Sequence, residues 1–488
     1  MPDGHTQRIM ILSGLASLLL SLLAIGQTDI INHDGVLYLR AIEGDAESIR
    51  RIGNWLFYSK LIGWLSAATG LDVEKSAYLL NTLLDLLTVL AFLRFVEELG
   101  GKGRTLIWAA ILILVLPYLN DNRAEIIRDH GYWAFTMVAM LFYLKLYKGF
   151  SWKWLLLWNL SMGLATLFRV EGVAFLLLMP LGLLLRPGPL AGRMREVALC
   201  LLPAILVLGI LLAWHLLGNG AGNRLTRLAA NSQELLEIFT ERIPSKATQL
   251  RDTLLPDLSP GSANLLIYIA LLISIAKDLA ESLSWPLALL LLFHRRLTTT
   301  PLPRAYTTTL LLYGGISLVI LLLQGGLHFV MVSRYTMALA LMLLPIVVFT
   351  LEQLWLQRQA RPPWVGIAIA LLIAGLAGDS LIESRSPKPH IREAASWVSK
   401  TLPPGSRILT DYEFLRLSYY AQKSGSRYHI QQFRGKTRLS RFDYALVRDP
   451  RGALARRLQS MAAQAIWSSG EGQNHVTAYR LRNESPSR

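Results

Sequence analysis

The chain has 488 residues, of which 53% are hydrophobic and only 17% are charged. So large an apolar excess excludes an ordinary water-soluble protein. The formal net charge of +16 favours anionic neighbours such as lipid head groups. The single cysteine, Cys200, lies in an apolar run, which excludes a disulfide framework, and no Cys/His spacing is typical of a structural zinc site.

Apolar runs of about 15 to 22 residues match the length that a helix needs to cross a hydrocarbon core of about 30 Å. Such runs are too long and too uniformly apolar for barrel strands, so the spans are helices. The first run follows Arg8 and lacks an Ala-x-Ala-like cleavage site, and we interpret it as a retained span rather than a signal peptide. We predict about eleven transmembrane helices, near residues 8–27, 77–98, 105–119, 133–148, 153–168, 171–186, 197–217, 263–293, 305–323, 337–354 and 363–379.

The orientation follows from the basic connectors, because Lys and Arg near membrane ends stay on the cytoplasmic side. One kinked crossing is predicted over 263–293, with the bend at Pro286, because two short crossings would leave Arg295 and Arg296 outside. The outer segments are then 28–76, 120–132, the tight 168–171 turn, 218–262, 324–336 and the tail. The working surface is therefore expected on the non-cytoplasmic side.

Two domains are predicted: a transmembrane domain over 1–380 and a small soluble α/β domain over 381–488. Within the first, the amphipathic segment 50–75 has the aromatic spacing of a helix lying at the membrane surface. In the tail, changes of hydrophobic period predict helices 390–401, 412–421 and 451–462 and strands 406–410, 443–448, 464–468 and 475–481. The tail holds 19 Lys and Arg against 8 Asp and Glu, a net charge of +11. This excess indicates either an anion-binding surface or a solvated basic one.

A first polar cluster follows the first span and contains His33, Asp34, Gly35, Tyr38 and Arg40. An acid so close to the membrane surface can act on a lipid-linked substrate, where Asp34 would serve as general base toward an acceptor hydroxyl. The alternative is that Asp34 caps a helix that begins near Gly35. A capping role for Asp34 would not exclude a role as general base.

A second cluster, residues 121–130, links the predicted third and fourth spans. At helical spacing Glu125, Arg128 and Asp129 share a face, with His130 next in the chain. Such a set is suited to a divalent cation or a phosphate. The alternative is an ion-pair loop that neutralises itself.

Two further clusters interrupt the apolar pattern. Arg169 and Glu171 stand at a turn between two spans, where they must face a polar cavity or each other. His328, Arg334 and Tyr335 precede the predicted tenth span, where an interfacial Tyr or a snorkelling Arg is the alternative. Guanidinium groups bind phosphate with fixed bidentate geometry. Arg128, Arg169 and Arg334 are therefore expected to converge on one anionic group, with Asp34 and Asp129 nearby.

These motifs, in this order and on one side of the membrane, resemble the GT-C superfamily of polytopic glycosyltransferases, especially bacterial relatives of protein mannosyltransferases and aminoarabinose transferases. The resemblance covers nearly the whole chain. It implies transfer of a sugar, with inversion, from a polyprenyl-phosphate donor to a lipid, glycan or protein acceptor. His33–Asp34–Gly35 departs from the Asp–Glu pair of protein mannosyltransferases, and the Asn-glycosylating signature is not visible, so Asn-linked transfer is not expected.

The resemblance also implies roles for individual residues. Asp34 matches the catalytic acid of the family, and Asp129 is assigned beside it. The residues expected to bind the donor phosphate are Arg128, Arg169, Arg334 and Tyr335. The residues expected to support the site are His33, Tyr38, Glu125, His130, Glu171 and His328. A divalent cation is left open, because metal dependence varies across the superfamily and no ligand set here is typical of calcium or zinc. The expected location is the bacterial cytoplasmic membrane, with the site and the C-terminal domain on the periplasmic side and no nucleic-acid partner.

Two other classes of protein compete with this interpretation. A lipid or sugar transporter would carry charges at mid-span and inverted repeats, whereas these charges sit at outer ends and no repeat is clear. A non-catalytic envelope assembly protein would use the basic tail as a binding module and would tolerate loss of Asp34.

Overall fold

The computed structural model describes residues 4–53, 55–217, 237–298, 302–360, 362–382, 388–422, 427–448, 451–469 and 475–481. The chain forms two compact units. The membrane unit comprises Met1–Leu23, Leu79–Arg123 and Arg128–Ile382, and the α/β unit comprises Ala24–Tyr78, Ala124–Ile127 and Glu383–Arg488. Part of the predicted outer loop 218–262, residues 218–236, lies outside the described residues.

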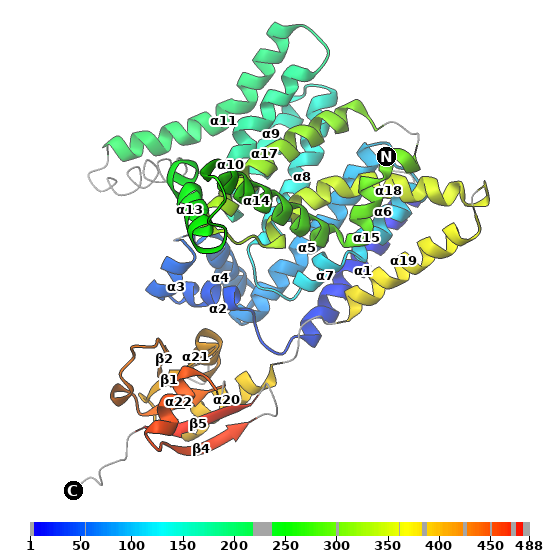
Figure 1. Cartoon of the computed structure of the whole chain (residues 1–488). Helices are drawn as coiled ribbons and strands as arrows, with labels where there is room; N and C mark the ends of the chain where they lie inside the picture. The colour runs from blue at the N-terminus through cyan, green and yellow to red at the C-terminus, as the bar shows by residue number, and fades with distance from the viewer. Residues whose placement is uncertain are drawn as a thin grey trace. The chain divides into compact units, whose positions relative to one another are not determined.

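The membrane unit is built from helices (Figure 1), as the apolar runs predict. Its elements are α1 (Gly4–Gln27), α5 (Val73–Glu98), α6 (Arg104–Leu114), α7 (Pro117–Asn122), α8 (Asp129–Lys148), α9 (Trp152–Phe168), α10 (Gly172–Leu178), η1 (Met179–Leu185), α11 (Leu190–Leu217), η2 (Ile238–Arg242), α13 (Ile243–Leu254), α14 (Pro260–Leu283), α15 (Trp285–Leu292), α16 (His294–Leu297), α17 (Arg304–His328), η3 (Ser333–Tyr335), α18 (Met337–Leu356), η4 (Arg358–Ala360) and α19 (Trp364–Leu381). The first residues of α5 and the last of α1 belong to the α/β unit.

Within the described residues, six helices are long and apolar enough to cross a membrane: α1, α5, α14, α17, α18 and α19. The apolar window of α18 is 78% buried and that of α5 is 61% buried, against 17–33% for the other four. The helices α18 and α5 are therefore central, while α1, α17 and α19 expose large side chains such as Leu12, Leu311 and Leu371. Exposed apolar helix faces of this kind are suited to lipid contact. The protein is an integral membrane protein, and the number of eleven spans stays a prediction.

Two of the predicted spans are interrupted. The span 105–119 ends as a helix at Leu114, and Pro117 opens the separate short helix α7. The span 263–293 breaks at Ser284, where φ is 69°, and Pro286 lies within the first two residues of α15. A proline is accepted in the first turn of a helix and breaks one that continues through it. The predicted bend is thus present two residues before Pro286.

The α/β unit combines an N-terminal helical segment with the C-terminal sheet domain. Its helices are α2 (His33–Ile42), α3 (Ala46–Arg51), α4 (Phe57–Thr69), α20 (Pro389–Thr401), α21 (Phe414–Gln422) and α22 (Ala453–Ser460), with the 3-10 turn η5 (Leu439–Arg441). The strands are β1 (Arg407–Thr410), β2 (His429–Gln432), β3 (Tyr444–Val447), β4 (Gln464–Ser469) and β5 (Val476–Arg480). Every element predicted in the tail is present, with bounds within two residues of the expected ones.

The five strands form one sheet in the order β2-β1-β3-β5-β4. Strand β1 runs parallel to β2 and β3, and β5 runs antiparallel to β3 and β4. Successive side chains of a strand point to opposite faces, so Tyr444 and Leu446 pack with α20 and α21, while Ala445 and Val447 pack with α22. The sheet is therefore covered by helices on both faces, which confirms the predicted fold class of a helical membrane protein with a small α/β domain.

The N-terminal segment of the α/β unit packs onto the sheet domain. The side chain of Ile30 packs against the α20–α21 core, and the backbone N–H of Ile31 donates to the Tyr420 hydroxyl at 2.9 Å. Arg40 donates from Nη2 to Ser418 Oγ at 2.7 Å and to Gln422 Oε1 at 3.0 Å. The guanidinium of Arg40, a member of the first polar cluster, thus holds α2 against α21.

Candidate active site

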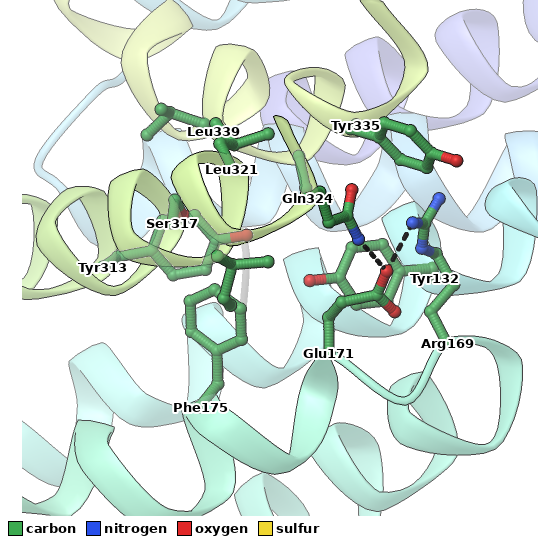
Figure 2. A pocket seen from close by; sticks show the side chains of 12 residues that line it. Tyr132, Arg169, Glu171, Phe175, Tyr313, Ser317, Leu321, Gln324, Tyr335 and Leu339 are labelled. Atoms are coloured by element: carbon green, nitrogen blue, oxygen red, sulfur yellow. Dashed lines mark hydrogen bonds and ion pairs between the residues drawn. The ribbon is translucent and has the colours of Figure 1, made fainter. Parts of the chain in front are cut away.

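A strongly charged group lies buried in the membrane unit, where Arg169 meets two carboxylates. The side chain of Arg169 is 5% exposed; its Nη1 pairs with Asp129 Oδ1, and its Nη2 donates to Glu171 Oε1 at 2.5 Å. Gln324 Nε2 donates to the same Glu171 oxygen at 2.5 Å (Figure 2). Buried charges are tolerated when they are paired and hydrogen-bonded. We call Asp129, Arg169, Glu171 and Gln324 the Arg169 cluster.

Helix ends bring these side chains together. Arg169 follows the last residue of α9, Glu171 precedes the first residue of α10, and Asp129 is the first residue of α8. The helices α8 and α9 pack side by side, as Figure 1 shows. A Cβ at Gly131 would overlap the Phe168 ring, so glycine lets the start of α8 come this close to the end of α9. This close approach places Asp129 beside Arg169.

Two tyrosines flank the Arg169 guanidinium. Its Cζ lies 4.4 Å from the ring centroid of Tyr335 and 5.7 Å from that of Tyr132, which are cation–π distances. Arg334 lies near the same Tyr335 ring, with its Cζ at 5.6 Å. Figure 2 shows Tyr335 beside Arg169, with Glu171 and Gln324 pointing toward each other. The structure thus brings the predicted residues Arg169, Arg334 and Tyr335 together.

The turn η3, which carries Arg334 and Tyr335, is tied to the end of α14. Ser282 Oγ donates to the carbonyl of Ser333 at 2.8 Å, and Ser333 Oγ donates to Glu281 Oε2 at 2.9 Å. The hydroxyl of Thr336 donates to the carbonyl of Asp278 at 3.0 Å. These bonds fix where Tyr335 lies.

Glu171, in the turn before α10, remains ionised in this environment. Burial raises the pKa of Glu171, but the charge and hydrogen bonds of Arg169, together with the field of Arg128, outweigh burial and lower the pKa to about 2. The carboxylate is therefore negative at any physiological pH. Among the described residues, its Oε2 atom has no hydrogen-bond partner although it is buried, and the same holds for Oε1 of Gln324.

The Arg169 cluster borders a small cavity. Its walls include Tyr132, Phe175, Tyr313 and Leu321 (Figure 2). Its free space is about 20 Å³. A cavity of this size holds about one water. The cavity is too small for a sugar ring.

Three other predicted site residues of the membrane unit lie outside the Arg169 cluster. Arg128 is the half-buried residue that precedes the first residue of α8. His328 is the last residue of α17 and is exposed. His130 is fully buried, and its Nδ1 lies 2.7 Å from Oδ1 of Asp85, a residue outside the cluster.

Asp85, His130 and Arg123 form a second buried polar group, which the sequence patterns did not predict. The side chains of Asp85, His130 and Arg123 are all 0% exposed, and Arg123 Nη1 lies 3.9 Å from Asp85 Oδ2. Arg123 also donates to Asn120 Oδ1 at 2.7 Å and to Ser21 Oγ at 2.8 Å. The presence of a charged residue inside the predicted span 77–98 is the signal that could have found Asp85.

Replacing Asp85 with asparagine is expected to destabilise the membrane unit by about 3–5 kcal/mol, because Arg123 would stay buried without a counter-charge. The midpoint of thermal unfolding in detergent measures this loss. Asp252→Asn is the matched control, since Asp252 is 58% exposed and pairs with its neighbour Arg251. Equal midpoints for the Asp85 and Asp252 variants would contradict the expectation.

The first polar cluster lies in the α/β unit. Helix α2 begins at His33 with Asn32 at the N-cap position, so Asp34 lies in the first turn and is not the cap. The capping alternative for Asp34 is therefore wrong. Asp34 is half-buried and His33 is exposed. Tyr38 is buried and packs edge-on against Tyr58, with the ring centroids 5.0 Å apart.

Ile126, from the second polar cluster, contacts the start of α2. Asn32 Oδ1 accepts from the N–H of Ile126 at 2.8 Å, and its Nδ2 donates to the carbonyl of Ile126 at 3.3 Å. A Cβ at Gly35 would lie 2.9 Å from Ile126 Cβ, so a glycine after Asp34 permits this contact. The first two clusters, far apart in the sequence, are thus joined within the α/β unit.

The predicted shared helical face of Glu125, Arg128 and Asp129 is wrong. Helix α8 begins only at Asp129, and Glu125 lies in a bend before it. The division between the two compact units also falls between Ile127 and Arg128. Ile126 instead contacts the start of α2 at Asn32 and Gly35, which local spacing does not reveal. The expected approach of Asp34 to the three arginines stays a prediction.

No group of three or more His, Cys, Asp and Glu side chains suited to a metal ion occurs within the part of the chain that the structure describes. Asp129 and Glu171 each pair with the Arg169 guanidinium. The arrangement is suited to binding an anion or a sugar, because carboxyl and guanidinium groups are held in fixed positions.

No known family profile matches the sequence, and no curated protein matches it either. Several solved structures are similar to this chain at 12% sequence identity. The oligosaccharyltransferase of Archaeoglobus fulgidus, tethered to an acceptor peptide with the NVT sequon, has a TM-score of 0.46 over 88% of this chain and 64% of its own. This chain therefore spans less than two thirds of the length of that protein.

Two further solved structures are similar over most of this chain. ArnT from Cupriavidus metallidurans, in the apo state, has a TM-score of 0.42 at 12% identity and matches over 97% of both chains. The Archaeoglobus fulgidus oligosaccharyltransferase in complex with Zn and sulfate has a TM-score of 0.47 at 12% identity, over 90% of this chain and 67% of its own.

Proposed function

We propose that this protein is a membrane glycosyltransferase that moves a sugar from a polyprenyl-phosphate donor to an acceptor at the outer face of the cytoplasmic membrane. The observation that carries the proposal is the Arg169 cluster, in which a buried guanidinium joins two carboxylates beside Arg334 and Tyr335. Such fixed charges in a largely dry site stabilise charge that develops on a leaving group.

The charge balance suits a singly charged phosphodiester. The three guanidiniums of Arg128, Arg169 and Arg334 stand against the two carboxylates of Asp129 and Glu171, so one positive charge is in excess. Arg128 and Arg334 are proposed to contact the phosphate directly, while both terminal nitrogens of Arg169 pair with the two acids. Arg169 then holds both carboxylates in place.

Asp34 is proposed as the general base. Asp129 is already engaged by Arg169 through Oδ1, which leaves this carboxylate less open to contact with an acceptor hydroxyl. Asp34 instead lies half-buried in the first turn of α2.

Donor entry is proposed to require a movement near Tyr335, because the cavity of about 20 Å³ is too small for a sugar and lids or loops commonly open such sites.

The proposal is tested with the full-length protein in nanodiscs, supplied with a panel of polyprenyl-phosphate sugars and an extract of envelope lipids and glycans. We expect release of polyprenyl phosphate together with a glycosylated acceptor that mass spectrometry detects. Cells that lack the gene should lose the same glycan. A protein that moves the donor across the bilayer of proteoliposomes without cleaving it would instead be a transporter.

A cysteine introduced at His328, an exposed residue, is expected to react with a membrane-impermeant maleimide in intact spheroplasts. Lys102 lies in a basic connector that is predicted to be cytoplasmic. A cysteine at this position should react only after the membrane is permeabilised. Both are made in a Cys200→Ser background, because Cys200 is the single native cysteine. Labelling of both positions from the same side would contradict the predicted orientation.

A further inference from the structure

A groove on the surface of the α/β unit is not used by the proposed transfer. It lies between helix α20 and strand β4 and has a volume of about 450 Å³. Its lining includes Arg392, Ser396, Trp397 and Lys400 from α20 and Trp467 from β4. Volumes of this order are typical of small-molecule sites. We call it the α20–β4 groove.

The groove has an aromatic surface. The rings of Trp397 and Trp467 are stacked, with centroids 5.0 Å apart and planes inclined by 16°. Both side chains pack against the sheet core yet remain half-exposed. Strand β4 is an edge strand of the sheet, and Ile466 and Ser468 beside Trp467 are exposed. The stacked rings cover one face of each other, and the half-exposed remainder of the pair is apolar surface that a ligand can contact.

Polar groups stand at intervals along this surface. Arg392, Ser396 and Lys400 follow one another at four-residue spacing, so they lie along one side of α20, each about 6 Å from the next. Arg392 and Lys400 are exposed, and the Arg392 Cζ also lies 5.2 Å from the Tyr420 ring centroid. Glu393, which accepts from Ser469 Oγ, adds an acceptor to these donors. With two cations against one acid, the groove is positively charged.

We propose that the α20–β4 groove binds an acidic oligosaccharide. The apolar faces of sugar rings pack on indole surfaces, while their hydroxyls require both donors and acceptors, which Ser396 and Glu393 supply. Arg392 and Lys400 form charge-assisted hydrogen bonds with carboxylate or phosphate groups on the sugar. The inference goes beyond the proposed transfer, and binding is measurable whether or not the protein is a glycosyltransferase.

The test is calorimetric titration of the full-length protein in phosphatidylcholine nanodiscs with tetragalacturonic acid. We expect this acid to bind about tenfold more tightly than maltotetraose, its neutral counterpart. Citrate, which has charge without sugar rings, should not bind, and a higher salt concentration should weaken the binding of the acid. Tight binding of citrate, or binding of neither saccharide at roughly millimolar concentration, would overturn the proposal.

Lys400→Gln is a variant that should leave the fold intact, because Lys400 is exposed, and we expect it to weaken binding about threefold. Trp467→Ala should weaken binding by about tenfold or more, and Trp467→Phe should retain most of the affinity. Arg456→Gln removes an exposed cation of α22 outside the groove and should change nothing. Equal losses for Lys400→Gln and Arg456→Gln would mean diffuse attraction and would overturn the proposal.

Anionic lipid is the competing occupant of the groove. The same titration in phosphatidylglycerol nanodiscs distinguishes the two, because lipid head groups would compete for Arg392 and Lys400. We expect the saccharide to keep most of its affinity there. Complete loss of saccharide binding in these nanodiscs would mean that lipid occupies the groove, and would overturn the proposal.

Discussion

Replacing Arg169 with alanine is expected to abolish sugar transfer and to lower the free energy of unfolding by about 3–5 kcal/mol, because two buried carboxylates would lose their counter-charge. The side chain of Arg169 is 5% exposed and joins Asp129 to Glu171. Donor binding should fall more than acceptor binding, since the cluster is proposed to face the donor phosphate. Thermal unfolding in detergent and separate titrations of donor and acceptor measure these effects.

Arg94→Ala is the matched control, because it removes a more exposed arginine from the same membrane unit. Arg94 is 40% exposed and pairs with Glu97 at 2.7 Å, so its removal should cost less than about 1 kcal/mol. Combining Arg169→Ala with Asp129→Asn and Glu171→Gln removes the uncompensated charges, and we expect stability to return while transfer stays absent. Equal losses of donor and acceptor binding in the single variant, after correction for unfolded protein, would leave Arg169 with a structural role only.

Replacing Asp34 with asparagine is expected to reduce turnover by about 10²- to 10⁴-fold, the usual contribution of a general base. The fold should persist, because asparagine has nearly the same shape and the N-cap position of α2 belongs to Asn32. The rate of polyprenyl phosphate release and the midpoint of thermal unfolding test these two expectations separately.

Asp45→Asn is the matched control for Asp34→Asn. Asp45 caps α3 in the same unit by accepting from the N–H of Ser48 at 2.8 Å, and asparagine is an equally good cap. This variant should therefore keep both turnover and stability. Unchanged turnover in Asp34→Asn would remove Asp34 from the mechanism, and Asp129→Asn would then be the next variant to assay.

Local sequence patterns were sufficient to predict many of the helices and strands. The length of the apolar runs predicted α1, α5, α17, α18 and α19, because a helix that crosses lipid must satisfy its own backbone hydrogen bonds within one continuous segment. Hydrophobic period likewise predicted α20 and β3 of the small domain. Strand β2, His429–Gln432, was not predicted, because it lies at the edge of the sheet, where few of its side chains are buried and no apolar alternation is needed.

The sequence by itself thus determined the class of the protein, the places where charge interrupts the apolar runs, and most element bounds. Only the tertiary structure decided which charges meet. Glu171 and Gln324 are 153 residues apart yet share a hydrogen bond, whereas Glu125 and Asp129, close neighbours in the chain, fall into different compact units. The physical reason is that helix and strand signals depend on neighbours within a few residues, while an ion pair depends on how packing brings helix ends together.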